Sequence, residues 1–135
     1  MSSEANKQSV AKAMEGLSHG DGRTFVDLMS DDFTWTYKGS TNWRGSYRGK
    51  STVRSKLLAP LFDNFDGTYK NMPRRIISEG DIVVVECEGS VATKAGERYD
   101  NKYCYVIRMA EGKMVELTEY MDTALADRVL APPND

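Results

Sequence analysis

The sequence has few of the residues that build covalent or metal-centred sites. Its 135 residues include two cysteines and one histidine. Cys87 and Cys104 do not make a disulfide framework, and with a single histidine they cannot complete a four-ligand zinc site. A glycine-rich phosphate loop, a nucleophile elbow and any metal-ligand spacing are also missing. We therefore expect neither a cofactor nor a metal.

Long apolar runs and an excess of one charge are absent as well. The longest apolar run is Ile82–Val85, whereas a membrane-spanning helix needs about 20 residues. The first residues, MSSEANKQ, lack the apolar core of a signal peptide. Eighteen Lys and Arg against twenty Asp and Glu leave a net charge of -2, which offers little attraction to nucleic acid or anionic membranes. We expect a soluble, cytoplasmic protein that binds neither.

The chain length fits one domain over residues 1–135, with 131–135 as a flexible tail. Apolar residues at three- and four-residue steps, and then at alternate positions, predict the following elements: helices over 4–18, over 23–29 and from Ser51 with an interruption near Pro60; strands over 33–37, 68–79, 82–91, 98–109 and 114–121; and a last helical turn over 124–130. Between the first strand and the third helix, residues 38–49 form a polar loop of the kind that often covers a site.

The order of these elements predicts an α+β fold. The turns at residues 79–81, 94–96 and 111–113 are short, so consecutive strands are antiparallel neighbours. A curved antiparallel sheet wrapped around the N-terminal helices would form a conical barrel with an internal pocket. Such a pocket is the default place for a small-molecule site.

Several strings along the chain carry a resemblance to a known family. In order, they are His19-Gly20-Asp21, Asp31-Asp32-Phe33-Thr34-Trp35, Tyr47-Arg48-Gly49-Lys50-Ser51, Tyr99-Asp100-Asn101-Lys102-Tyr103-Cys104, Gly112-Lys113-Met114-Val115 and Glu119-Tyr120-Met121-Asp122-Thr123. Together they make the chain resemble the SnoaL-like branch of the nuclear transport factor 2-like superfamily, which includes ketosteroid isomerase-like and polyketide cyclase-like proteins. The resemblance implies a conical fold, a small and largely apolar organic ligand in the cone, and dimers through the outer sheet face. It does not imply one function, because members include isomerases, epoxide hydrolases, cyclases and noncatalytic binders.

Two chemistries of that superfamily lack their residues here. The resemblance to steroid isomerases places Tyr37 where the carboxylate base belongs, Ala13 where the tyrosine belongs and Cys104 near the protonated acid. The resemblance to limonene epoxide hydrolases places Cys87 and Gly89 at the arginine and the first aspartate. We therefore disfavour both mechanisms in their unmodified form.

The cyclase mechanism requires fewer specific residues than these two, namely an aromatic pocket and one carboxylate that transfers a proton. The resemblance places Asp122 in that role, so we expect carboxylate-mediated isomerisation or cyclisation with Asp122 and Tyr37 as catalytic residues. Asp122 could instead cap the last helical turn. Glu119 is the rival carboxylate, and which of the two faces the pocket is open. The alternative function is a noncatalytic binding module, which needs shape and hydrogen bonds but no tuned acid.

The expected ligand-binding residues lie on the predicted strands. Phe33, Trp35 and Tyr37 share one strand face, and the resemblance directs that face into the cone. Cys87 alternates with Glu86 and Glu88, so we expect it to point inward. Glu119 completes this part of the predicted site.

The strand over 98–109 has two candidate inner faces. Its tyrosines occupy one face, while Cys104 and Val106 occupy the other, and periodicity alone does not decide between them. The steroid-isomerase register sends Cys104 and Val106 into the pocket as ligand-binding residues. The tyrosines would then cover the outer face, where a second copy could bury them, and we predict a homodimer on this basis.

Overall fold

The computed structural model describes residues 2–133, so the last two residues of the predicted tail lie outside it. A six-stranded curved sheet with the strand order β2-β1-β6-β5-β4-β3 dominates the fold. Its strands are β1 (Met29–Tyr37), β2 (Gly45–Arg48), β3 (Phe65–Glu79), β4 (Ile82–Thr93), β5 (Lys102–Ala110) and β6 (Lys113–Met121). The α+β fold predicted from the sequence is confirmed. One detail differs, because β1 and β6 run parallel while all other neighbours are antiparallel.

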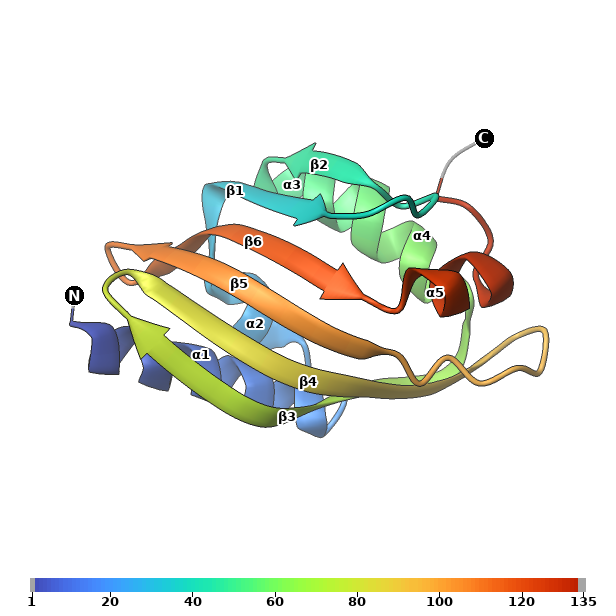
Figure 1. Cartoon of the computed structure of the whole chain (residues 1–135), viewed down its shortest axis with the longest axis horizontal. Helices are drawn as coiled ribbons and strands as arrows, with labels where there is room; N and C mark the ends of the chain where they lie inside the picture. Colours follow the sequence, from blue (N-terminus) through green and yellow to red (C-terminus); the bar gives the residue numbers. More distant parts are fainter. Residues whose placement is uncertain (1, 134–135) are drawn as a thin grey trace.

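The main helices cover one face of this sheet (Figure 1). They are α1 (Ser3–Ser18), α2 (Arg23–Asp27) and a third segment made of α3 (Lys50–Thr52), the π-helical turn Val53–Leu58 and α4 (Ala59–Phe62). The short helix α5 (Thr123–Val129) follows β6 at one end of the sheet. Within residues 2–133, none of the helices is long and apolar enough to cross a membrane.

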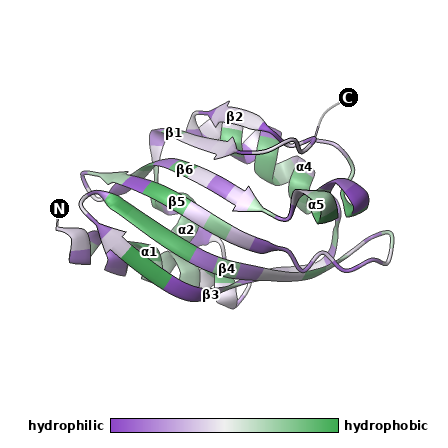
Figure 2. Cartoon of the chain, in the orientation of Figure 1, coloured by the Kyte–Doolittle hydropathy of each residue, from purple (hydrophilic) through white to green (hydrophobic). Residues whose placement is uncertain are grey.

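The core lies between the inner sheet face and these helices. Helix α1 begins after Ser2, whose hydroxyl accepts a hydrogen bond from the Ala5 N–H, and it buries Val10, Ala13 and Met14 against the sheet. Strand β4 alternates buried and more exposed residues along its length, as a half-buried strand should. Figure 2 shows the resulting mixture of hydrophobic and hydrophilic segments across β3, β4 and β5.

Two predicted boundaries near the start of the sheet were wrong. The second helix ends at Asp27, and β1 begins at Met29, so Asp31 and Asp32 lie in the strand rather than at a helix end. The polar loop over 38–49 contains β2, whose register pairs Trp35 with Tyr47. Its backbone therefore extends the sheet, which a composition rich in Gly, Ser and Thr did not indicate.

The same loop does not cover the pocket. Trp43 is 1% exposed and packs near Tyr37, with ring centroids 6.4 Å apart. Asp127 of α5 holds the loop by accepting hydrogen bonds from the Thr41 hydroxyl at 2.8 Å and the Asn42 N–H at 2.9 Å. The loop is thus packed into the core, and none of its residues lines the cavity.

The third helical segment also departs from its prediction. It begins at Lys50 after Gly49 rather than after a Ser51 cap, and it continues past Pro60 to Phe62. Pro60 lies in the first turn of α4, where the missing N–H costs little. The π-helical turn immediately before it changes the hydrogen-bond spacing, so the helix is irregular there but not broken.

Candidate functional site

A cavity of about 440 Å³ lies between the inner sheet face and the helices. Its wall is rich in aromatic side chains, namely Phe25, Trp35, Tyr37, Phe62, Tyr69, Tyr99, Tyr103 and Tyr105. Asn71 and Glu119 are its buried polar members, whereas the exposed Arg23 and Arg54 mark its open side. A mostly apolar cavity with a few polar groups has the character of a small-molecule site.

Glu119 is the buried carboxyl group of this cavity. It is 2% exposed, and its Oε1 accepts a hydrogen bond from the Trp35 indole N–H at 3.0 Å. The sheet register places Tyr37 on one side of it and Tyr105 on the other. Burial raises the pKa of Glu119 to about 8, although hydrogen bonds from Trp35 and Tyr37 act in the opposite direction. Near neutral pH this group can therefore both release and accept a proton.

Asp122 lies outside the cavity. It is exposed, and its side chain accepts a hydrogen bond from the Leu125 N–H at 3.2 Å, which caps α5. The helix-cap reading of Asp122 is thus confirmed, and Glu119 is the carboxylate at the cavity. The reason is local, since the strand ends at Met121 and the chain turns into α5 immediately afterwards.

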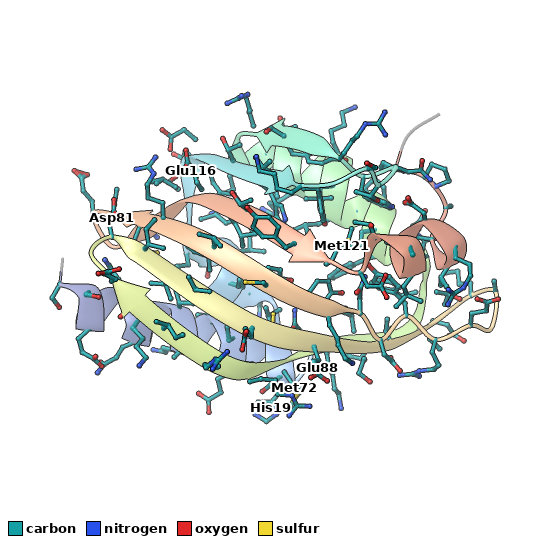
Figure 3. All side chains as sticks on the ribbon, in the orientation of Figure 1. His19, Met72, Asp81, Glu88, Glu116 and Met121 are labelled. Carbon is teal, nitrogen blue, oxygen red and sulfur yellow. The ribbon has the colours of Figure 1, made fainter. Side chains whose placement is uncertain are left out.

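No histidine accompanies either carboxylate. Figure 3 labels His19 below β3, whereas Met121 is labelled at the end of β6, beyond β4 and β5 in this view. His19 is not among the residues that line the cavity.

The inner face of β5 is the one that carries the tyrosines. Tyr103, Tyr105 and Ile107 are buried, while Cys104 and Val106 are only half-buried on the opposite face. The predicted inward positions of Cys104 and Val106 were therefore wrong, and with them the tyrosine-covered outer face that suggested a dimer. Periodicity could not decide the phase. The burial of the tyrosine hydroxyls depends on polar partners from β3, far away in sequence.

Those partners form a hydrogen-bonded cluster on the cavity wall. Asn71 Nδ2 donates to the Tyr69 hydroxyl at 3.3 Å and to the Tyr105 hydroxyl at 3.1 Å. The Tyr69 hydroxyl donates in turn to the Tyr103 hydroxyl at 3.0 Å. The sequence reasoning missed Tyr69 and Asn71. Their signal was two polar residues on one face of β3, where an inward strand face would ordinarily be apolar.

The remaining predicted site residues divide into two groups. Trp35 and Tyr37 line the cavity, as expected for a strand face directed inward. Phe33 and Cys87 are buried but do not line it, and Phe33 packs edge-on to Trp35 with ring centroids 6.1 Å apart. Burial raises the pKa of the Cys87 thiol well above its ordinary value, so the thiol stays protonated as core filler. Across residues 2–133, no group of three or more His, Cys, Asp or Glu side chains is placed to hold a metal ion.

Comparison with known proteins gives a family and a set of similar folds. The SnoaL-like domain model matches residues 10–117. Bal32a, from a soil-derived mobile gene cassette, is 19% identical with a TM-score of 0.81, over 96% of this chain and 98% of Bal32a. A protein from Jannaschia sp. CCS1, provisionally identified as a SnoaL-like polyketide cyclase, is 16% identical with a TM-score of 0.78, over 98% of this chain and 95% of that one.

A third similar structure contains a ligand. TerC, co-crystallised with polyporic acid, is 21% identical with a TM-score of 0.77, over 93% of this chain and 97% of TerC. None of the curated protein sequences matches this chain. At these identities the structural matches show a shared fold.

Proposed function

Because this chain belongs to the SnoaL-like family, we propose that its cavity binds a small, largely apolar organic molecule and that Glu119 transfers a proton on it. The reaction class is carboxylate-mediated isomerisation or cyclisation. One observation carries the proposal: a carboxyl group with a pKa of about 8 lies buried in an aromatic cavity. Such a combination is typical of a group adapted to acid–base chemistry.

The proton transfer follows from the properties of Glu119. As a carboxylate it can remove a proton from a carbon next to a carbonyl, and as an acid it can return that proton to another carbon or to oxygen. With a pKa of about 8, roughly a tenth of the molecules carry the carboxylate at pH 7, and that carboxylate is a stronger base than an exposed one. The Trp35 indole N–H holds its position through a hydrogen bond, and Tyr37, its neighbour in the sheet register, is a positioning residue.

One comparison supports this reaction class, and a second supports an organic ligand. A similar fold from Jannaschia sp. CCS1 is provisionally identified as a polyketide cyclase, and TerC was co-crystallised with the organic compound polyporic acid. The apolar wall of the cavity suits a small, largely apolar organic ligand. Glu119 takes the role that the sequence suggested for Asp122.

A carbon acid of known chemistry provides the test. 5-Nitrobenzisoxazole opens when a base removes its ring C–H proton and the N–O bond breaks, which gives a coloured cyanophenolate. We expect the wild-type protein to accelerate this elimination with a rate that rises around pH 8, Glu119→Gln to lose at least about 100-fold, and Asp122→Asn to keep the wild-type rate. Equal rates for wild type and Glu119→Gln would contradict the role of Glu119. Binding without elimination would favour the noncatalytic binding module.

We also propose that two copies associate through the outer sheet face. Ile77 and Tyr120 are 52% and 48% exposed there, and the register aligns Ile77, Val84 and Val106 in one row across β3, β4 and β5. Figure 2 shows hydrophobic segments of these strands side by side. Around them, Arg75 pairs with Glu86 and Arg108 with Glu116, so the surface carries both charges and can face a copy of itself.

Light scattering at micromolar concentration tests this association. We expect the mass of a dimer for the wild-type protein and of a monomer for Ile77→Asp. A monomeric wild type would refute the dimer and would leave the cavity unaffected.

A further inference from the structure

Asn71, one of the residues that line the cavity, carries a buried and unpaired polar atom. It is 1% exposed, and its Nδ2 donates hydrogen bonds to the Tyr69 and Tyr105 hydroxyls. Its Oδ1 has no hydrogen-bond partner among residues 2–133. Leaving a buried acceptor unpaired costs about 1–3 kcal/mol, so proteins rarely keep one without a use.

One end of the Asn71 amide stays unpaired in either orientation of the amide. Rotating it by half a turn would let its oxygen accept from the two tyrosine hydroxyls and would leave its NH2 group unpaired instead. A hydroxyl group can donate to the oxygen and can also accept from the NH2 group. Of the common ligand groups, a hydroxyl therefore satisfies Asn71 in either orientation.

Tyr105 offers the second contact for such a hydroxyl. Its own hydroxyl oxygen accepts from Asn71, and its proton points toward the Cys87 thiol, a weak acceptor, so a ligand oxygen can compete for that proton. Burial raises the pKa of Tyr105 well above its ordinary value, which keeps that proton in place at every working pH. The register pairs Tyr105 with Glu119, so the Asn71–Tyr105 pair and the proton-transferring group lie in the same part of the cavity.

Gly89 leaves the space that this cluster needs. It pairs with Asn71 across β3 and β4, and a Cβ at its position would lie 3.0 Å from the Tyr103 hydroxyl and 3.1 Å from the Tyr69 hydroxyl. Any side chain at residue 89 would therefore displace the side chains of Tyr69 and Tyr103. The glycine lets the Tyr69 and Tyr103 hydroxyls meet above the strand.

We propose that Asn71 and the Tyr105 hydroxyl bind a phenolic or enolic hydroxyl of a flat, otherwise apolar ligand. The flat shape follows from the aromatic wall, where Trp35 lies stacked on Tyr37 and edge-on to Tyr105. This inference rests on the proposed function, since it assumes that the cavity holds an organic molecule. The hydroxyl would orient the ring system relative to Glu119 and so determine which carbon the carboxylate reaches.

A matched pair of probes tests the hydroxyl site. 2-Naphthol and 2-methylnaphthalene have nearly the same size and differ in one hydroxyl, and equilibrium dialysis at pH 7 gives the affinity of the protein for each. We expect the ratio of the two association constants, naphthol over methylnaphthalene, to fall about 10-fold in Asn71→Leu. Tyr105→Phe leaves the aromatic wall intact and should lower the same ratio by about 3-fold or more.

Two control variants separate this site from the rest of the cavity. Leu61→Ala changes the apolar wall and should weaken both probes without changing their ratio. Glu116→Gln, on the outer sheet face, should keep both affinities and their ratio. An unchanged ratio in both Asn71→Leu and Tyr105→Phe would overturn the hydroxyl site and leave the proposed proton transfer standing. Failure of the wild-type protein to bind either probe would overturn both proposals.

Discussion

Glutamate occurs on both faces of β6, exposed on one face and buried on the other. Glu116 lies on the outer face, where it is exposed and pairs with Arg108 at 3.1 Å. Glu119 lies on the inner face, where it is buried and has a pKa of about 8. The two side chains are three residues apart in sequence, yet only Glu119 lies in the cavity, where the pKa of its carboxyl group is raised. Burial, and not residue type, makes this difference.

The outer face resembles an ordinary protein surface with a mixed-charge rim. Its ion pairs are exposed, and such pairs contribute little to stability. The inner face concentrates polar groups that have no access to bulk water and satisfy one another through side-chain hydrogen bonds. Substitutions on the inner face should therefore have large and pH-dependent effects on stability. The same substitutions on the outer face should have small effects.

The largest expected effect is that of Glu119→Gln on stability. A group whose pKa rises from 4.5 to about 8 on folding holds its proton more tightly in the folded protein, so wild-type stability falls as the pH rises from about 4.5 to 8. Glutamine carries no such cost. We expect Glu119→Gln to be more stable than wild type by on the order of 4 kcal/mol at pH 9 and to differ little from it at pH 4.

Urea unfolding at the two pH values measures this difference. Glu116→Gln serves as the matched control, because it makes the same chemical change on the outer face of the same strand. A pH-independent effect of Glu119→Gln would show that the carboxyl group titrates normally in the folded protein.

Gly89→Ala should have the next largest effect. The added methyl group would meet the Tyr103 and Tyr69 hydroxyls at 3.0–3.1 Å and would push them apart, and overpacking of this kind costs about 1–3 kcal/mol. The variant should also lose part of its affinity for 2-naphthol. Gly96→Ala is not an adequate control because its φ is +90°, whereas Ser90→Ala changes an exposed neighbour on the same strand and should leave stability nearly unchanged.

Asp122→Ala should have a smaller effect of a different kind. Removing the N-cap of α5 costs about 1 kcal/mol, because the Leu125 N–H loses its acceptor. The midpoint near pH 8 of the elimination of 5-nitrobenzisoxazole should not move, since Asp122 does not line the cavity. A shifted pH profile in this variant would place Asp122 in the proton transfer after all.

The smallest effect belongs to the outer ion pairs. Arg108 and Glu116 are well exposed, so water and salt screen their attraction. We expect the urea midpoint of Glu116→Gln to match that of the wild-type protein within the precision of the measurement. A clear loss of stability would mean that the proposed dimer buries this ion pair and does not leave it exposed at the rim, and light scattering would show whether the variant still forms the dimer.

Much of the fold could be predicted from the sequence. The helix over 4–18 and the long strands of the sheet follow from regular apolar spacing, and their observed ends differ by a few residues. The structure of residues 38–49 was harder to predict. Their polar composition is that of a loop, whereas β2 forms because β1 offers a free edge, and Trp43 is buried because Asp127 holds its loop from far along the chain.

The candidate site was predictable only in part. Trp35, Tyr37 and Glu119 were identified from the strand pattern and the resemblance, and all three line the cavity. The face of β5 was assigned wrongly because the prediction followed the steroid-isomerase register, although the charged Lys102 and Arg108 share the face of Cys104 and Val106 and favour the outside of the sheet. The buried hydroxyls of Tyr103 and Tyr105 also need Tyr69 and Asn71, whose side chains bind them from β3, more than 30 residues earlier.

The titration of the Glu119 carboxyl group is the most direct test of the proposed chemistry. Carbon-13 NMR of protein labelled at the glutamate side chains, with Glu119→Gln to assign the signal, would follow this group through the pH range. We predict a midpoint of about 8. A midpoint near the ordinary value of 4.5 would mean that Glu119 is a carboxylate throughout the neutral range, and it would contradict the proposal that burial in the cavity prepares this group for proton transfer.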